Sequence, residues 1–465
     1  MPPYTTDDTI VAVSTPLGRA ALGVIRLSGL RAVAIVDGIF QSPGQTPLST
    51  AASHTLRHGH ITDDNRIIDE VLIALMRGPH SYTGDDVVEI SAHGGPVLVD
   101  RIVRVCLKHG ARHAERGEFT FRAFINGKMD LAQAEAVADL IESKTDLSAH
   151  AALSQLTGNL SEQIRTFRAV LIDLLSHLEV ALDYAEEDIR FVSAGELLTS
   201  LQALQEQVVG LQRTADKGKL LREGVRAAII GKPNVGKSSL LNALLERERA
   251  IVTDIPGTTR DVIEELLDVR GIPVVIMDTA GLRTHTADAI ERLGQERTRA
   301  SLAAADLVLW VVDTSQPLSQ EDRAIAALLT ETGKAPATIA LFNKCDRPRA
   351  FGDDAFSDLS PGNAPIKISA LTRQGLADLE SSIVRHTGTD ALPADTPFVN
   401  ARHRDALARA AQAITEATAA LGTDATEEII AFHVREALTT LGEITGETTT
   451  EEILQNIFSR FCVGK

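Results

Sequence analysis

The sequence contains few cysteines. Its 465 residues include three, Cys106, Cys345 and Cys462, and they lie far apart along the chain. A disulfide framework or a four-ligand zinc site needs more cysteines at closer spacing. This scarcity excludes both kinds of site and favours a reducing, cytoplasmic location.

Positive charge and long apolar runs are also scarce. Lys and Arg number 46 against 63 Asp and Glu, which gives a formal net charge of −17. Any contact with nucleic acid must therefore come from a local basic patch. The amino terminus has no basic start followed by an apolar core, and no run of eighteen apolar residues occurs. We therefore predict neither secretion nor membrane spanning.

The segment Cys462 to Lys465 has the outline of a prenylation box. However, Lys465 is not a usual terminal residue of such a box, and Gly464 occupies a normally aliphatic position. Residues 401–465 contain six basic and ten acidic residues, so a polybasic flank is also missing. We expect no lipid anchor here.

Proline is absent between Pro96 and Pro233, and from about residue 130 apolar residues recur at three-to-four spacing. The same pattern returns after Pro397, whereas short β-branched runs alternate with helical stretches in between. The first part mixes strand-like runs with turn clusters. We predict a multidomain α/β and α protein: an α+β domain (1–122), a discontinuous helical bundle (123–221 plus 384–465) and an inserted doubly wound α/β domain (222–383).

A phosphate-binding motif opens the inserted domain. Gly231 to Ser238 fit the pattern G-x-x-x-x-G-K-S, after an apolar strand and before a helical stretch. Glycines let backbone N–H groups surround phosphate oxygens, Lys237 neutralises their charge, and Ser238 can bind Mg²⁺. This context predicts a nucleoside triphosphate site.

Further motifs follow in the order typical of GTPases: Thr258-Thr259, Asp278-Thr279-Ala280-Gly281 (the pattern Asp-x-x-Gly), Asn343-Lys344-Cys345-Asp346 and Ser369-Ala370. Asn343-Lys344-Cys345-Asp346 follows a strand, and a carboxylate can accept both the N1 and N2 protons of guanine, which adenine lacks. Together these motifs predict GTP binding by the following residues: Asn234, Val235, Gly236, Lys237, Ser238, Ser239, Thr253, Thr258, Thr259, Asp278, Thr279, Ala280, Gly281, Asn343, Lys344, Asp346, Ser369 and Ala370.

One position departs from the common GTPase pattern. Many GTPases have a glutamine directly after the glycine of Asp-x-x-Gly, where it orients the attacking water. Here that position is Leu282, whose side chain cannot hydrogen-bond to water. Another group must therefore position the water and offset the charge of the transition state.

Motifs along nearly the whole chain resemble the bacterial tRNA-modification GTPases of the MnmE (TrmE) family. They include Ile25-Arg26-Leu27-Ser28-Gly29, Tyr82-Thr83-Gly84-Asp85-Asp86, His93-Gly94-Gly95-Pro96, Gly117-Glu118-Phe119-Thr120, Asn126-Gly127-Lys128, Leu131-Ala132-Gln133-Ala134-Glu135-Ala136 and Cys462-Val463-Gly464-Lys465.

The resemblance implies an answer to the missing glutamine. Members of this family are activated by K⁺ and dimerise through their GTPase domains, with K⁺ taking the place of an arginine finger. By motif match its ligands are Asn234, Thr253, Ile255 and Thr258, and those of Mg²⁺ are Ser238 and Thr259. Taken without the family, the less favoured alternative for Asn234 is a turn-stabilising asparagine after Pro233.

The family's catalytic set then comprises Lys237, Asn234 and a water-orienting glutamate. Glu291 is the best match for that glutamate, although the loop before it varies in length. Without the resemblance, Glu291 and Glu296 would pass as solvated helix residues paired with neighbouring arginines.

The resemblance also implies a folate site in the α+β domain. The matching residues are Arg26, Glu89, Lys128 and Lys465, whose charges suit the glutamate carboxylates and the pterin of 5-formyltetrahydrofolate. Taken singly, each is more commonly a solvated residue or part of a structural ion pair. Cys462 is either a functional thiol or a small semi-buried side chain.

Residues 101–128 form the most basic stretch, with seven Lys or Arg against Glu115 and Glu118. This stretch could face the folate, contact tRNA phosphates, or be a solvated helix face, and the sequence does not decide among these.

Two functions fit these observations. The first is a homodimeric GTPase that, with a flavin-dependent partner resembling MnmG (GidA), adds an aminomethyl or carboxymethylaminomethyl group to C5 of the tRNA wobble uridine from a folate one-carbon unit. The second is a regulatory or ribosome-assembly switch whose folate-like domain is only a scaffold. Retention of Arg26, Glu89 and Lys128 together with Cys462 to Lys465 favours the first.

Overall fold

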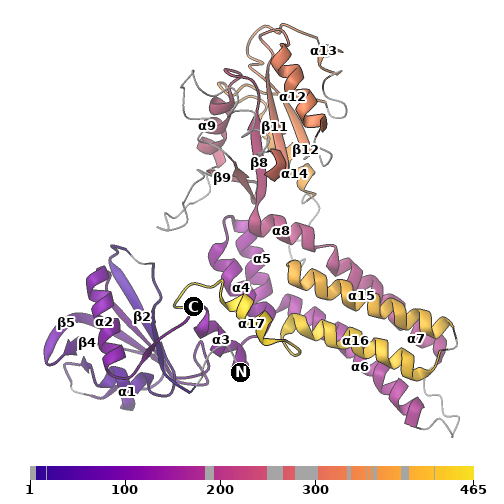
Figure 1. Ribbon diagram of the computed structural model, residues 1–465. Coiled ribbons are helices and arrows are strands. Elements are labelled where there is room, and N and C mark those ends of the chain that lie inside the picture. Colours follow the sequence, from indigo (N-terminus) through magenta and orange to yellow (C-terminus); the bar gives the residue numbers. More distant parts are fainter. Residues whose placement is uncertain are drawn as a thin grey trace. The chain divides into compact units, whose positions relative to one another are not determined.

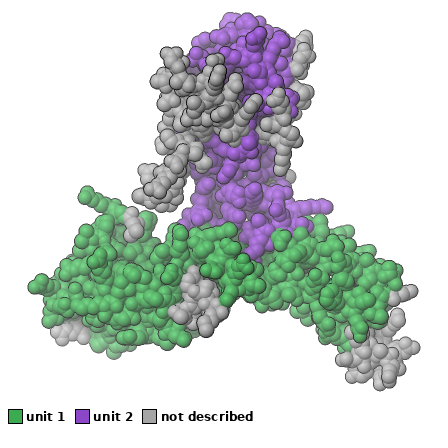
Figure 2. All heavy atoms as spheres, viewed as in Figure 1, with its two compact units in different colours: residues 1–138, 155–209, 405–465 green, residues 139–154, 210–404 purple. Residues whose placement is uncertain are grey.

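The structure is a computed structural model that describes residues 7–16, 18–44, 46–183, 193–248, 265–277, 302–331, 337–352, 354–357, 359, 364–388, 397–423 and 425–465. The chain forms two compact units (Figure 2). Unit 1 comprises residues 1–138, 155–209 and 405–465, and unit 2 comprises residues 139–154 and 210–404. No helix in these described ranges is both long and apolar enough to cross a membrane.

The first part of unit 1 is a seven-stranded sheet with helices (Figure 1). The strand order is β3-β4-β5-β6-β2-β1-β7, and every pair is antiparallel except β1 with β7. Its elements are β1 (Ile10–Val13), β2 (Leu22–Ser28), α1 (Ala32–Asp37), β3 (Phe40–Gln41), the 3₁₀ helix η1 (Leu48–Thr50), β4 (Thr55–Asp63), β5 (Arg66–Met76), β6 (Val87–His93), α2 (Pro96–Lys108) and β7 (Arg112–His113).

One face of this sheet is covered by α1 and α2. Alternate residues of the strands, such as Ile25 and Ile90, are buried with Ile35 and Ile102 of these helices in one apolar core. Because successive side chains of a strand point to opposite faces, Arg26 and Glu89 lie on the other face. The fold thus leaves charged groups on the face that the helices do not cover.

The remaining elements outside the nucleotide-binding part are helices. They are α3 (Glu118–Ile125), α4 (Leu131–Glu142), α5 (Asp146–Leu156), α6 (Asn159–Asp183), α7 (Ala194–Gln212), α8 (Ala215–Glu223), α15 (Ala401–Gly422), α16 (Glu427–Thr445) and α17 (Glu451–Phe458). Within unit 1, α6 packs along α16 (Figure 1). Ion pairs join Arg435 of α16 to Glu179 of α6 and Arg409 of α15 to Glu443 of α16. The helices predicted on the two sides of the inserted domain are present.

Unit 2 contains a six-stranded sheet of order β13-β12-β11-β8-β10-β9, parallel except for β9 with β10. Its elements are β8 (Val225–Ile230), α9 (Lys237–Glu248), β9 (Glu265–Val269), β10 (Ile272–Ile276), β11 (Leu307–Asp313), α12 (Gln320–Glu331), β12 (Ala337–Asn343), α13 (Asp354–Ser357), β13 (Ile366–Lys367) and α14 (Leu376–Thr387).

Helices cover both faces of the sheet of unit 2. Leu309 of β11 is buried on the face of α9 and α14, whereas Trp310 is buried with α12 and Phe356 on the opposite face. Strands β9 and β10, which follow β8 in the sequence, lie on one side of β8 in the sheet, whereas β11 lies on its other side. Ligands of doubly wound sheets bind at the carboxyl ends of the strands where this order reverses. The topology therefore points to the ends of β8 and β11.

Candidate functional site

The loop between β8 and α9 turns sharply at the expected place. Gly231, Asn234 and Gly236 have φ angles of +152°, +63° and +100°. These left-handed conformations suit glycine and asparagine and turn the backbone before α9 begins at Lys237. The loop and the positive end of the helix together form an anion-binding site.

The ammonium group of Lys237 is held within this loop. Its Nζ donates to the carbonyl oxygens of Gly231 at 2.7 Å and Lys232 at 2.8 Å. Burial lowers the pKa of Lys237, an effect partly offset by the charge of Glu321. The lysine is thereby positioned to neutralise phosphate charge at the start of α9.

Asn343 connects the segments that the sequence assigns to phosphate and base. Its Nδ2 donates to the carbonyl oxygen of Val235 at 2.7 Å, and its Oδ1 accepts from the backbone N–H of Ala370 at 3.0 Å. The residue is 2% exposed, and any Cβ at Gly236 would collide with its Nδ2. Glycine is therefore required at position 236 for this close approach as well as for its φ angle.

Lys344 makes a second connection to the phosphate loop. Its Nζ donates to the carbonyl oxygen of Asn234 at 2.9 Å and to Asp313 Oδ2 at 2.6 Å. Burial would raise the pKa of Asp313, but hydrogen bonds from Lys344 and Ser315 outweigh it, and the pKa is lowered. Asp313 therefore stays ionised and fixes the lysine.

Asp346 is oriented by the loop that follows β13. Its Oδ1 accepts a hydrogen bond from Ser369 Oγ at 2.6 Å. This bond lowers the pKa of Asp346, so the side chain is a carboxylate at neutral pH. An acceptor held in this way suits the two N–H groups on one edge of guanine. The structure brings the asparagine, lysine and aspartate of this motif to the same end of the sheet as the phosphate loop.

Not all of the predicted nucleotide site can be placed. Ser238 and Ser239 lie in the first turn of α9. Several predicted residues lie outside the described residues: Thr253, Ile255, Thr258, Thr259, Asp278, Thr279, Ala280, Gly281 and Glu291. The assignments of these residues remain predictions from the sequence.

A second constellation lies on the face of the unit 1 sheet opposite α1 and α2. Arg26 and Glu89 face each other across β2 and β6, and Arg26 contacts Glu89 Oε1 from Nε at 2.8 Å and from Nη2 at 2.7 Å. The guanidinium also lies 5.2 Å from the ring centre of Tyr82 and 5.7 Å from that of Phe119. The pair is thus packed between a sheet and two aromatic rings.

The carboxyl-terminal segment reaches this constellation. Val463 pairs with Arg116, and Arg26 Nη1 lies 3.5 Å from the carbonyl oxygen of Gly464. Lys465 Nζ lies 5.8 Å from the centre of the Tyr82 ring, and burial together with the charge of Arg26 lowers the pKa of Lys465. Gly464 has a φ of +103°, which favours glycine at this turn. The tail is an ordered part of unit 1.

Lys128 and Cys462 lie apart from these contacts. Lys128 is exposed, and its Nζ donates to the carbonyl oxygen of Pro79 at 2.9 Å. Cys462 is exposed, and its carbonyl oxygen accepts from the N–H of Gly117 at 3.5 Å. The structure therefore brings Arg26, Glu89 and Lys465 together and shows Lys128 on the neighbouring loop.

Tyr82 lies in one of the family-like motifs, but the sequence analysis predicted no role for it. Its hydroxyl hydrogen-bonds to Thr120 Oγ1 at 2.8 Å, and its ring lies beside both Arg26 and Lys465. An aromatic ring between two cations suits a planar ligand. A tyrosine at the start of the Tyr-Thr-Gly-Asp motif was the only available signal.

A buried ion network was also missed. Arg122 and Glu118 are both 0% exposed and lie 3.0 Å apart, and Arg112 and Asp8 complete the cluster at contacts of 2.5 to 2.6 Å. Although burial acts to raise it, hydrogen bonds from both arginines lower the pKa of Asp8 to about 2. These charges connect α3 to the start of β1.

The basic stretch 101–128 is largely neutralised by its neighbours. Lys108 contacts Asp63 and Asp64 at 3.0 Å, Arg104 contacts Asp100 at 2.8 Å, and two further arginines belong to the buried network. Most of the charge that could form a phosphate-binding patch is therefore paired with carboxylates.

Comparisons with known proteins agree with this architecture. Residues 9–128 match the family described as the GTP-binding protein TrmE N-terminus, and residues 131–462 match the MnmE helical domain. The tRNA modification GTPase MnmE of Clostridioides difficile (strain 630) is 44% identical over 461 residues and covers 99% of each chain. That of Geobacillus kaustophilus (strain HTA426) is 44% identical over 463 residues, 98% of this chain and 99% of the other.

The chain belongs to the MnmE family. As an MnmE-family protein it is a GTP hydrolase that acts in tRNA modification. The helical domain and the GTPase domain predicted from the sequence are confirmed. A crystal structure of Era in complex with MgGDPNP and nucleotides 1506–1542 of 16S ribosomal RNA matches 36% of this chain and 59% of its own, at 27% identity and a TM-score of 0.28.

Proposed function

We propose that this protein is a K⁺-activated, cytoplasmic GTPase that hydrolyses GTP as a homodimer. With a flavin-dependent partner resembling MnmG (GidA), it would convert C5 of the tRNA wobble uridine to the aminomethyl or carboxymethylaminomethyl form. In this proposal the protein has three domains. Residues 1–122 bind folate and dimerise, residues 123–221 plus 384–465 form the helical domain, and residues 222–383 form the GTPase domain.

The observation that supports the folate part most directly is the convergence of Lys465, Arg26 and Glu89 beside Tyr82. A folate has a planar ring system and an anionic glutamate tail, which suit an aromatic ring and two cations. Both contacts from Arg26 use Glu89 Oε1, so Oε2 would accept from the pterin N–H groups. A simple GTPase switch has no need for a site of this kind, to which the carboxyl-terminal segment contributes Lys465.

In the nucleotide site, the described residues fit the proposed ions. Asn234 lies exposed on the phosphate loop at a φ of +63°, where its side-chain oxygen would bind K⁺ together with Thr253, Ile255 and Thr258. Ser238, at the start of α9, would bind Mg²⁺ together with Thr259. K⁺ supplies positive charge beside the phosphates, and the protein residues hold and orient the nucleotide.

Hydrolysis would use the remaining members of the site. Lys237 neutralises the phosphate oxygens, and Glu291 orients the attacking water in place of the missing glutamine. GTP turnover would then open and close the dimer, whereas the folate one-carbon unit and the flavin of the partner would carry out the modification of the base.

A titration with 5-formyltetrahydrofolate tests the folate site. We expect the full chain to bind it, and the variants Lys465→Ala and one lacking residues 462–465 to bind it at least about tenfold more weakly, because they lose a charge-assisted contact. Arg460→Ala is the matched control, since this exposed basic residue of the same segment lies outside the constellation. Equal binding by all four proteins would show that the folate assignment is wrong.

A further inference from the structure

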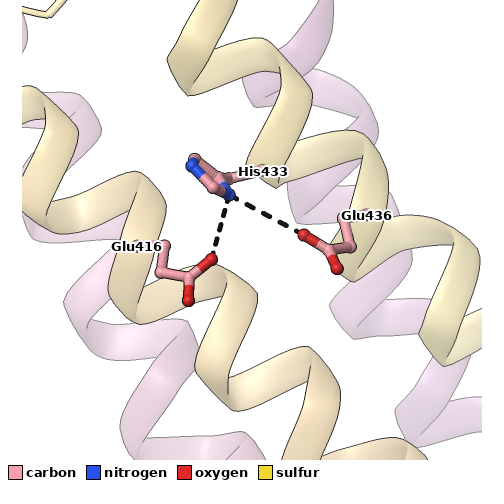
Figure 3. Close-up of side chains that lie close together, drawn as sticks. All are labelled: Glu416, His433 and Glu436. Atoms are coloured by element: carbon pink, nitrogen blue, oxygen red, sulfur yellow. Dashed lines mark ion pairs between the residues drawn. The ribbon is translucent and has the colours of Figure 1, made fainter.

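Three metal-ligating side chains that belong to neither of the sites described above converge in the helical bundle. Glu416 of α15 and His433 and Glu436 of α16 point toward one another (Figure 3). His433 Nδ1 lies 3.2 Å from Glu416 Oε2 and 3.7 Å from Glu436 Oε2. All three ligand atoms lie within 4.8 Å of one another.

These separations match those of donors around one small ion. Zinc binds nitrogen and oxygen ligands at about 2.0–2.2 Å, so neighbouring donors are roughly 3.0 Å apart in octahedral and roughly 3.5 Å apart in tetrahedral geometry. The two contacts of His433 Nδ1, at 3.2 and 3.7 Å, are close to these values. The third edge, between the two carboxylates, is no longer than 4.8 Å.

The imidazole itself gives a second, independent observation. His433 Nδ1 is buried, yet no described residue accepts or donates a hydrogen bond there, although the two carboxylates lie close by. The oxygens therefore lie to the sides of the direction in which an N–H at Nδ1 would point. That is the arrangement of donors around a shared ion, because the ion occupies this direction and the other ligands surround it.

A neighbouring residue orients one of the carboxylates. Gln412 Nε2 donates to Glu416 Oε1 at 2.8 Å, which leaves Oε2 directed toward His433. Outer contacts of this kind fix the orientation of metal ligands. The side chains of Glu416 and Glu436 are 42% and 53% exposed, so water can complete the coordination and the ion can enter from solvent.

We propose that Glu416, His433 and Glu436 bind one divalent transition-metal ion of the Zn²⁺ class and that this ion clamps α15 to α16. One imidazole and two carboxylates are a donor set that favours Zn²⁺ over Mg²⁺, which prefers oxygen ligands only. The site is separate from the Mg²⁺ that accompanies GTP, and the proposal does not depend on the folate or K⁺ assignments.

Binding of Co²⁺ to the nucleotide-free full chain, with excess Mg²⁺ present, tests the proposal. Co²⁺ substitutes for Zn²⁺, and its visible absorption reports nitrogen and oxygen ligands, whereas thiolate ligands add strong near-ultraviolet absorption. We expect one equivalent to bind without the thiolate signal, to be displaced by Zn²⁺, and to raise the thermal midpoint of the protein.

Substitutions then locate the ion. We expect His433→Gln and Glu436→Gln each to weaken Co²⁺ binding at least tenfold, and Gln412→Ala to weaken it by roughly tenfold. His177→Gln is the matched control, because His177 lies in α6 of the same bundle and, among the described residues, pairs with one carboxylate, Asp173. This variant should bind Co²⁺ like the wild type.

Two results would overturn the proposal. One is unchanged Co²⁺ affinity in His433→Gln and Glu436→Gln variants that remain folded by circular dichroism. The other is evidence that the cluster stabilises the bundle only through ion pairs between a protonated His433 and the two carboxylates, without a metal ion. In that case the thermal midpoints of wild type and His433→Gln would diverge on acidification, and neither would respond to Co²⁺ or Zn²⁺.

Discussion

The side-chain nitrogen of Asn343 lies 2.7 Å from the carbonyl oxygen of Val235, and this buried hydrogen bond joins the base-binding segment to the phosphate loop. The same side chain accepts from the N–H of Ala370 at 3.0 Å. Asn343 therefore links its own loop to the phosphate loop and to the loop that contains Ala370. Beside its predicted contact with GTP, Asn343 would thus influence binding through the positions of the loops that it links.

Asn343→Ala should therefore weaken GDP and GTP binding by about 10- to 100-fold, because it leaves buried partners unsatisfied at a cost of about 1–3 kcal/mol each. Titration with a fluorescent guanine nucleotide measures the change. Cys345→Ala is the control, since this partly exposed thiol of the same motif contacts only Gln374, at 3.7 Å, among the hydrogen-bond partners described. Equal loss in both variants would contradict a specific bridging role.

Asn234→Ala should abolish the advantage of K⁺ over Na⁺ in GTP turnover, because the variant lacks the side-chain oxygen proposed to bind the ion. Steady-state hydrolysis in K⁺ and in Na⁺ at equal ionic strength measures this preference. An unchanged preference would show that the K⁺ assignment is wrong, whereas a general loss of nucleotide binding would indicate a role in shaping the loop.

Glu291→Ala should leave GTP affinity within a few-fold while it lowers the hydrolysis rate by one or two orders of magnitude, as expected for loss of a group that positions water. Single-turnover hydrolysis together with a binding titration separates the two quantities. Glu296→Ala is the comparison, and a rate loss confined to that variant would move the role to Glu296.

Arg122→Met should destabilise unit 1 by roughly 3–5 kcal/mol, because it removes the fully buried partner of Glu118 and leaves that buried carboxylate with only the partly exposed Arg112 as an ion-pair partner among the described residues. Circular dichroism follows the whole chain, whereas the fluorescence of the single tryptophan, Trp310, reports the sheet of unit 2. We expect the first signal to change at lower urea and the second to keep its midpoint. Arg112→Met, which removes a side chain that is 36% exposed, should have a smaller effect.

The buried network also predicts a dependence on pH. The folded-state pKa of Asp8, about 2, lies below its ordinary value of 3.8, so the ionised group stabilises the fold above about pH 4. That contribution is lost as the pH falls from about 4 toward 2. Asp8→Asn should thus lower the thermal midpoint by a constant amount between about pH 7 and 5, and by less below pH 4. A difference that grows on acidification would contradict this sign.

Local motifs made the nucleotide site predictable from the sequence. The residues from Gly231 to Ser238 are contiguous, and the strand and helix on either side follow from β-branched runs and apolar spacing. Two of the short β-branched runs noted in the sequence, Arg226 to Ile230 and Leu307 to Val312, correspond to β8 and β11 within one residue at each end. Short-range patterns carry this information because the turn chemistry is local.

Features built from distant residues were not predictable in the same way. Asp8 and Arg122 are more than a hundred positions apart, and neither is unusual in its local context. Strand β4 was overlooked because its alternation is carried by polar residues such as Arg57 and His58. The basic stretch was visible as a charge count, but its neutralising acids, Asp63 and Asp64, come from another strand and its turn.

The contact between Lys344 and the backbone of Asn234 has a consequence for how such enzymes diversify. The carbonyl oxygen of Asn234, the residue proposed to bind the alkali ion, accepts a hydrogen bond from Lys344 of the segment predicted to bind guanine. A substitution at position 344 would therefore also change the ion requirement of the enzyme. Ion preference and base preference would then be inherited as coupled traits.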